Sequence, residues 1–159
     1  MKNSFVRAVF LAALTAATHA HADELVVAFN TMAGVSGPFK GAANPIRGVP
    51  GGGLAWKLDQ VSGELKRSGR LEIRIRGLVF AEGPNVGRNT VPNFRAIVSC
   101  QITNQTGSPD FLTLTTGLFP ATSTGDADIE ENLNLPAQCL APIVFVTSPT
   151  GSWFAVTGY

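Results

Sequence analysis

Apolar and polar residues alternate with a period of two in several short segments of the chain. The clearest case is RLEIRIRG, in which Leu71, Ile73 and Ile75 alternate with charged residues. A period of two places successive side chains on opposite faces of a β-strand. The segment is therefore predicted to be a strand with one buried face and one solvated face, which is typical of an antiparallel sheet.

Similar short runs, rich in apolar, β-branched and aromatic residues, recur along the chain between turns rich in Gly, Pro, Asn and Asp. Such runs are typical of strands. They cover 25–30, 55–61, 63–67, 77–81, 94–102, 111–118, 125–135, 139–146 and 153–157. No apolar stripe at helical spacing persists for three turns. The pattern predicts an all-β fold: a two-sheet antiparallel β-sandwich, immunoglobulin-like or jelly-roll-like.

Residues 34–53 are the main exception, because seven glycines and three prolines interrupt every period there. This composition predicts a loop. A loop of this length in a small domain is usually either functional or packed on itself. The sequence leaves these two possibilities open.

The first 22 residues are typical of a secretory signal peptide. Lys2 and Arg7 precede the apolar run VFLAALTAA, and the small-x-small pattern AHA ends at Ala22. The apolar run is much shorter than the roughly 20 residues that a membrane helix needs, so no integral membrane association is expected. We predict cleavage after Ala22, which leaves 23–159 as a single β-sandwich domain in an extracellular or periplasmic location.

Removal of the signal changes the chemistry that is available. His19 and His21 lie within it, so the mature chain has no histidine. Ser-His-Asp and Cys-His mechanisms are thereby excluded, as are His-ligated metal sites, and no cofactor is expected. The ten remaining Lys and Arg residues stand against eleven Asp and Glu residues, a formal charge of −1, which gives no reason to expect a nucleic acid partner.

The chain contains two cysteines, and each lies in a predicted core strand. Cys100 ends VPNFRAIVSC, and Cys139 begins CLAPIVFV. In an exported chain, two cysteines are most simply explained by one disulfide. Closing this loop would stabilise the fold by about 3–4 kcal/mol in the chain-entropy model. We expect the bridge to lock together the two layers of the sandwich.

An acidic segment offers the densest group of carboxylates in Asp126, Asp128, Glu130 and Glu131, of which the first three alternate along the predicted strand. The simplest interpretation is a solvated strand face that pairs with Arg74 and Arg76 of a neighbouring strand. Two weaker alternatives are a calcium site and a pair of catalytic carboxylates for glycan hydrolysis, since alternate strand residues lie roughly 7 Å apart.

Three aromatic residues, Trp56, Trp153 and Phe154, are weak candidates for a ligand-binding platform. Aromatic faces can stack on sugars, but tryptophan is also a usual core residue of β-sandwiches. Trp153 and Phe154 are adjacent, so on a strand they point to opposite faces, and one of them could face outward.

Three long stretches, GPFKGAANPIRGVPGGG, VPNFRAIVSC and GDADIEENLNLPAQCLAPIVFVTSPTGSWFAVTG, resemble a family of small secreted microbial proteins with no known activity. The patterns NPIRG, VPNF-x-A-x-VSC and C-x-APIVFVTSP-x-G-x-WFA-x-TG carry the resemblance, which covers nearly all of the mature chain. It implies secretion and the two cysteines. It implies no activity, cofactor or catalytic residue.

These observations favour a secreted, non-enzymatic β-sandwich that binds an extracellular ligand, a glycan or a protein, or that contributes to the cell surface. The lack of histidine is the main reason for not expecting an enzyme. The first alternative is a carbohydrate-active protein that binds glycans through exposed aromatics or hydrolyses them through paired carboxylates. The second is a calcium-dependent adhesion module.

Overall fold

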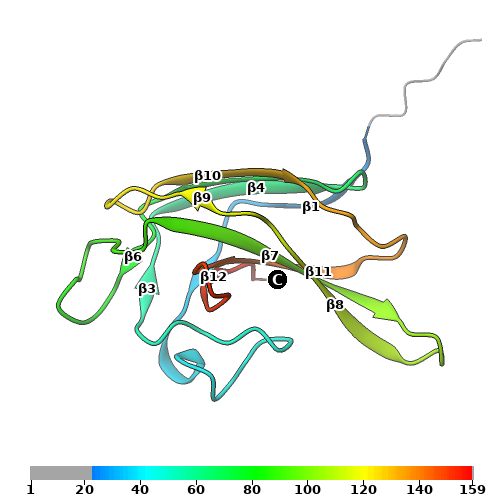
Figure 1. Ribbon diagram of the computed structural model, residues 1–159, viewed down its shortest axis with the longest axis horizontal. Helices are drawn as coiled ribbons and strands as arrows, with labels where there is room; N and C mark the ends of the chain where they lie inside the picture. The colour runs from blue at the N-terminus through cyan, green and yellow to red at the C-terminus, as the bar shows by residue number, and fades with distance from the viewer. Residues whose placement is uncertain (1–22, 159) are drawn as a thin grey trace, which may run out of the picture.

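Two antiparallel β-sheets pack face to face in the computed structural model, which describes residues 23–158 (Figure 1). This architecture confirms the predicted all-β, two-sheet antiparallel sandwich. The predicted signal segment, 1–22, lies outside the described residues. In Figure 1 the upper layer contains β1, β4 and β10, and the lower layer contains β7, β11 and β12.

Sheet I has the strand order β1-β4-β5-β10. Its strands are β1 (Leu25–Phe29), β4 (Gln60–Lys66), β5 (Arg70–Arg76) and β10 (Ala127–Asn132). The alternation predicted for β5 is confirmed, because Leu71, Ile73 and Ile75 are buried. The charged residues between them lie on the opposite, outer face of the sheet.

Sheet II has the strand order β2-β12-β11-β7-β8, and β9 continues along β7 beyond β8. Its strands are β2 (Ala33–Gly34), β7 (Asn93–Thr103), β8 (Pro109–Thr115), β9 (Phe119–Pro120), β11 (Leu140–Thr147) and β12 (Trp153–Val156). Phe94, Ala96 and Val98 alternate along β7 and belong to the hydrophobic core. The β7–β8 hairpin projects from one end of the molecule (Figure 1).

A small third sheet joins β3 (Trp56–Lys57) to β6 (Val79–Phe80). The pattern predicted one strand over 55–61, but the chain forms β3 and then starts β4 at Gln60. The break lets β3 reach an aromatic cluster in the core. Trp56 stacks on Phe154 with ring centroids 3.9 Å apart, and the Phe80 ring lies 4.2 Å from Trp56.

The predicted disulfide between Cys100 and Cys139 is confirmed, with 4.7 Å between the two Cα atoms. Cys100 lies in β7, and Cys139 immediately precedes β11. Because β7 and β11 are neighbours in sheet II, the bridge joins two strands of one sheet. The expectation that it would lock the two layers together was therefore wrong. The pairing of β7 with β11 already brings these residues side by side.

The loop 34–53 packs against the outer face of sheet II (Figure 1). The amides of Val35 and Gly52 donate to the carbonyls of Phe154 and Trp153, each at 2.8 Å. Within 23–158 the only helical element is the 3-10 turn Gly37–Phe39 in this loop, and so short a turn cannot span a bilayer. The loop thus pairs along the edge of β12 and covers part of the face of sheet II that points away from sheet I, where Arg47 bonds to the carbonyls of Ser99 and Ala141.

Candidate functional site

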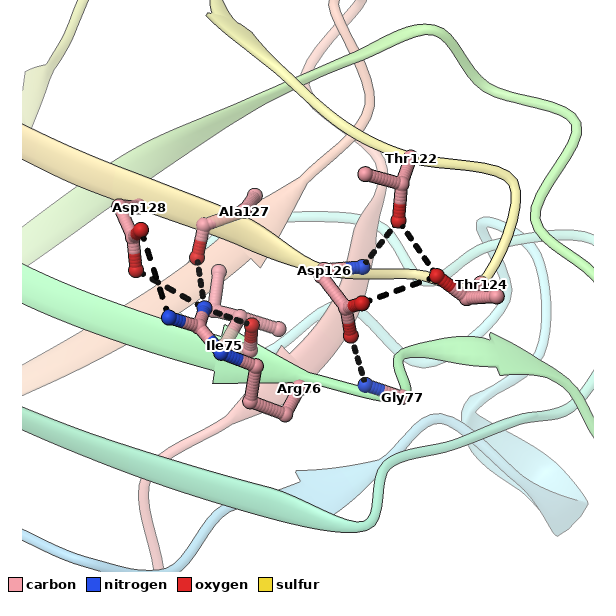
Figure 2. Close-up of polar contacts among 8 residues, drawn as sticks. All are labelled: Ile75, Arg76, Gly77, Thr122, Thr124, Asp126, Ala127 and Asp128. Atoms are coloured by element: carbon pink, nitrogen blue, oxygen red, sulfur yellow. Dashed lines mark hydrogen bonds and ion pairs between the residues drawn. The ribbon is translucent and has the colours of Figure 1, made fainter.

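The acidic segment around β10 forms specific contacts with the end of β5 (Figure 2). Asp126 accepts hydrogen bonds from the Gly77 amide and the Thr124 hydroxyl, both at 2.9 Å. The Thr122 hydroxyl in turn accepts from the Asp126 amide at 3.0 Å. These bonds, the Gly77 amide first, hold the pKa of Asp126 below its ordinary value. Asp126 therefore joins the turn before β10 to the residue after β5.

Asp128 and Glu130 of this segment form ion pairs across sheet I. Arg76 reaches Asp128 at 2.9 Å (Figure 2), and Arg70 reaches Glu130 at 2.9 Å. The hydrogen bond with Asp128 raises the pKa of Arg76 above its ordinary value. Within residues 23–158, no group of three or more His, Cys, Asp or Glu side chains is arranged to hold a metal ion.

The three aromatic candidates lie inside the protein. The exposed fractions are 3% for Trp56, 2% for Trp153 and 5% for Phe154. Both faces of β12 are covered, one by sheet I and the small sheet and the other by the loop 34–53, so neither Trp153 nor Phe154 presents its ring to solvent. A sugar could stack on these rings only after the core had opened.

A groove does lie on the outer face of sheet II, where the loop 34–53 meets β7 and β8. Its volume is about 370 Å³, and we call it the Arg47 groove. It is lined by Arg47, Gly48, Val49, Pro50, Ile97, Phe111, Thr113 and Gly151. One wall comes from the loop whose role the sequence left open, and most of the lining is apolar.

A tight turn places Arg47 at the edge of this groove. Ile46 and Val49 exchange two backbone hydrogen bonds, at 3.1 and 2.9 Å. The two residues between them have positive φ angles, +48° at Arg47 and +81° at Gly48. Two central residues with positive φ are the signature of a type I′ turn, which prefers Asn or Gly at both positions. An arginine at the first of them is strained.

The guanidinium of Arg47 is fixed in place by three contacts. Nη1 donates to the carbonyl oxygen of Ser99 at 3.0 Å and to that of Ala141 at 2.9 Å. The guanidinium carbon lies 4.7 Å from the centre of the Phe111 ring, which is a cation–π contact. Ala141 has a φ of +39°, and it and Arg47 are the only non-glycine residues with positive φ in the part of the chain that the structure describes. One arginine thus joins both strained positions.

Buried polar atoms without a partner gather on the same face of sheet II. Across the described chain these atoms are Arg95 Nε, Ser99 Oγ and Trp153 Nε1. Arg95 and Ser99 flank the groove residue Ile97 two positions away on either side, so all three share one face of β7. Trp153 pairs with Thr147, which pairs with Arg95, and it therefore belongs to the same face. Unpaired buried polar groups are rare and call for a physical explanation.

An apolar surface continues from the groove along the outer face. Leu140, Gln101 and Phe111 are opposite one another on three neighbouring strands. Phe111 and Leu140 are 49% and 53% exposed, although both are large apolar side chains. The groove therefore opens beside a solvent-exposed apolar edge.

Two further hollows lie on the outer face of sheet I, with volumes of about 220 and 420 Å³. Both border Arg74, and each has further charged side chains in its lining, such as Glu72 in the first and Asp59 in the second. They are not covered by a loop, and none of the unpaired buried polar atoms lies beside them. We therefore regard the Arg47 groove as the candidate site, although it is not the largest hollow.

Sequence reasoning did not identify Arg47 or Phe111. The available signal was the arginine inside NPIRGVPGGG, where the Arg-Gly pair occupies the two central positions of a tight turn. No family model, curated protein or solved structure matches the chain. The proposed role of the groove therefore depends on its geometry.

Proposed function

We propose that the protein is a secreted, non-enzymatic binding module whose ligand occupies the Arg47 groove. Its disulfide indicates an oxidising compartment, because disulfides persist outside the cytoplasm and are rare within it. This agrees with the secretory signal predicted for residues 1–22. The observation that carries the proposal is the rigid, strained positioning of Arg47 beside an open apolar groove.

Strain of this kind supports a binding role. A positive φ at a non-glycine residue costs of order 1–2 kcal/mol, and such residues cluster at ligand clamps and active sites. The bonds from Arg47 to two carbonyls hold its side chain in one position before any ligand arrives. Pre-organisation of this kind reduces the entropy lost on binding.

The lining of the groove does not suggest catalysis. In the described part of the chain, the one hydroxyl side chain that lines the groove is Thr113, and no lining carboxylate or imidazole is present to act as a base for it. An arginine, apolar walls and backbone groups are sufficient to bind and orient a ligand. We therefore favour binding over turnover at this site.

The proposal is tested by ligand-detected NMR with the purified, oxidised protein and a library of small anions, sugars and neutral apolar compounds. Hits are then mapped on the amide spectrum of the ¹⁵N-labelled protein. We expect at least one compound to shift the amide signals of Gly48, Thr113 and Gly151 in a saturable way. Hits confined to other surfaces, or none from any chemical class, would refute the proposed function.

Export is tested separately by expressing the full chain and sequencing the amino terminus of the secreted product. We expect the mature protein to begin at Asp23 and to contain no free thiol. Retention of the intact amino terminus in the cytoplasm would contradict the proposed location.

A further inference from the structure

We infer that the Arg47 groove binds a carboxylate carried on a small apolar body, with Arg47 as its anchor. This inference rests on the proposed function and names the chemistry of its ligand. Three features of the groove support it: its charge, the free donors of Arg47, and its size.

The charge on this face of sheet II is positive. Among residues 23–158, Arg47 is the only charged residue that lines the groove, and no Asp or Glu faces into it. Arg95 lies on the same face of β7 and forms no ion pair within residues 23–158. Its Nε is one of the buried donors without a partner. An anion entering the groove would meet the Arg47 guanidinium without repulsion from a lining carboxylate, and Arg95 adds positive charge on the same face.

The guanidinium of Arg47 retains donors for a ligand. Only Nη1 donates to protein acceptors among the described residues, and both of these acceptors are main-chain carbonyls. Nε and Nη2 therefore remain available on the side of the fork that matches a carboxylate. The carbonyls and the Phe111 ring fix the plane of the guanidinium, so an incoming carboxylate meets a donor pair that is already oriented.

The walls and the volume limit the rest of the ligand. Val49, Pro50 and Ile97 present apolar surface beside the arginine. A volume of about 370 Å³ is near the lower end for ligand sites and suits a single ring or a short aliphatic chain. Two sources share this chemistry: a free organic acid and the carboxyl terminus of a peptide that ends in an apolar residue.

The decisive probe is phenylacetate, and phenylacetamide is its neutral control of nearly the same shape. Both are titrated into the ¹⁵N-labelled, oxidised protein, and the amide signals of Gly48, Thr113 and Gly151 are followed. We expect phenylacetate to bind at least about tenfold more tightly, because hydrogen bonds between charged partners exceed those to a neutral amide by this order. Equal affinities would overturn the carboxylate inference and leave the proposed function intact. Failure of the whole compound library at this groove would overturn both.

The matched variant is Arg47→Asn. Asparagine tolerates positive φ and suits the type I′ turn, so the backbone at residue 47 is preserved while the guanidinium is lost. We expect the variant to keep the dispersed amide spectrum of a folded protein. We expect its affinity for phenylacetate to fall at least about tenfold. Unchanged affinity in the folded variant would refute the role of Arg47.

A second variant keeps the test decisive if loss of the Arg47 contacts unfolds the loop. Thr113→Trp fills the groove from β8, where residue 113 is exposed and its backbone pairing with Ser99 does not depend on the side chain. We expect this variant to fold and to lose phenylacetate binding. Retained binding would place the ligand outside the groove and overturn the inference.

The tripeptide Gly-Gly-Phe, with a free or an amidated carboxyl terminus, separates the two sources of the carboxylate. Binding of the free form but not the amidated form, at the same amides, supports a peptide terminus as the ligand. Binding of phenylacetate without binding of either tripeptide supports a free organic acid.

Discussion

Gly125 lies in the turn before β10 with a φ of +81°, and a Cβ at this position would overlap the carbonyl oxygen of Leu78. Gly107, in the turn between β7 and β8, has a nearly identical φ of +82°, but no atom lies within 4 Å of the corresponding point. The backbone conformation favours glycine at both positions. Only at Gly125 does a packed segment of the same chain, at Leu78, leave no room for a Cβ in addition.

This difference predicts unequal effects of substitution by alanine. Gly107→Ala is expected to lower the free energy of unfolding by about 1 kcal/mol, from backbone strain alone. Gly125→Ala is expected to lower the free energy of unfolding by about 2 kcal/mol more than Gly107→Ala does, because the turn must shift away from Leu78. Guanidinium denaturation of both variants measures the difference. Equal losses would show that the contact with Leu78 relaxes without cost.

Asp126 provides a second prediction at the scale of one residue. Its folded pKa is lowered, chiefly by the Gly77 amide, so its stabilising effect is present above the ordinary carboxyl pKa and is lost as the pH falls through the folded value. Asp126→Asn keeps one acceptor oxygen and loses the other. At pH 7 we expect it to lower the free energy of unfolding by about 1 kcal/mol, since the carboxylate is partly exposed.

The expected difference between wild type and Asp126→Asn shrinks as the pH falls below about 4, where the wild-type carboxylate takes up its proton. Denaturation curves at pH 7 and at steps down to pH 2.5 measure this. Asp128→Asn serves as the control, because it removes only a surface ion pair with Arg76 and should cost less. If the loss in free energy of unfolding caused by Asp126→Asn did not depend on pH, the ionised carboxylate of Asp126 would not be the stabilising group.

At the scale of elements, β7 and β11 form the centre of sheet II. β7 pairs with β11 on one side and with β8 and β9 on the other, and β11 in turn pairs with β12. The run Ile143–Val146 is apolar on both faces, which is typical of a central strand. The structure confirms this position and shows the covering layers: sheet I on one face and the loop 34–53 on the other. The disulfide reinforces this pair of strands at one end.

Loss of the disulfide is predicted to destabilise the protein strongly. Reduction, or the double change Cys100→Ala and Cys139→Ala, should lower the free energy of unfolding by about 3–4 kcal/mol, because the unfolded chain gains the freedom of an open loop. Thermal unfolding with and without a reducing agent measures the effect. The double variant should show no response to the reducing agent. A wild-type melting temperature that is unchanged on reduction would contradict the prediction.

At the scale of the whole molecule, aromatic contacts join the small sheet and the loop 34–53 to sheet II. Trp56 of the small sheet stacks on Phe154 of sheet II, and Phe94 of β7 packs edge-on against both rings. Trp153 lies under the loop 34–53, 6.4 Å from Phe39 and from Phe145 by ring centroid. The small sheet and the long loop therefore share the packing of the main core.

This packing predicts one cooperative unfolding transition. Trp56 and Trp153 report on the small sheet and the loop, whereas far-ultraviolet circular dichroism reports on the strands of the main sheets. We expect the fluorescence and dichroism transitions to coincide in denaturant, as they do in a two-state domain. A fluorescence transition at lower denaturant concentration would show that the loop and the small sheet unfold separately.

Much of the fold was predictable because its signals are local. The alternation in Arg70–Arg76 requires a two-faced strand, and it follows from the geometry of the backbone. The segments around Cys100 and Cys139 were predicted as strands from their composition, and the two cysteines were predicted to pair. The division of 55–61 between β3 and β4 was not predictable, since it depends on the position of Phe154 nearly a hundred residues later.

The sequence by itself determined the all-β class, the central strands and the existence of the disulfide, because these depend on the period of neighbouring residues and on the chemistry of two thiols. The tertiary structure alone decided that the disulfide lies within one sheet, that Trp56, Trp153 and Phe154 are buried, and that Arg47 meets Phe111. Each of these depends on which strands become neighbours. That choice is made by packing between segments far apart in the chain, and no local pattern records it.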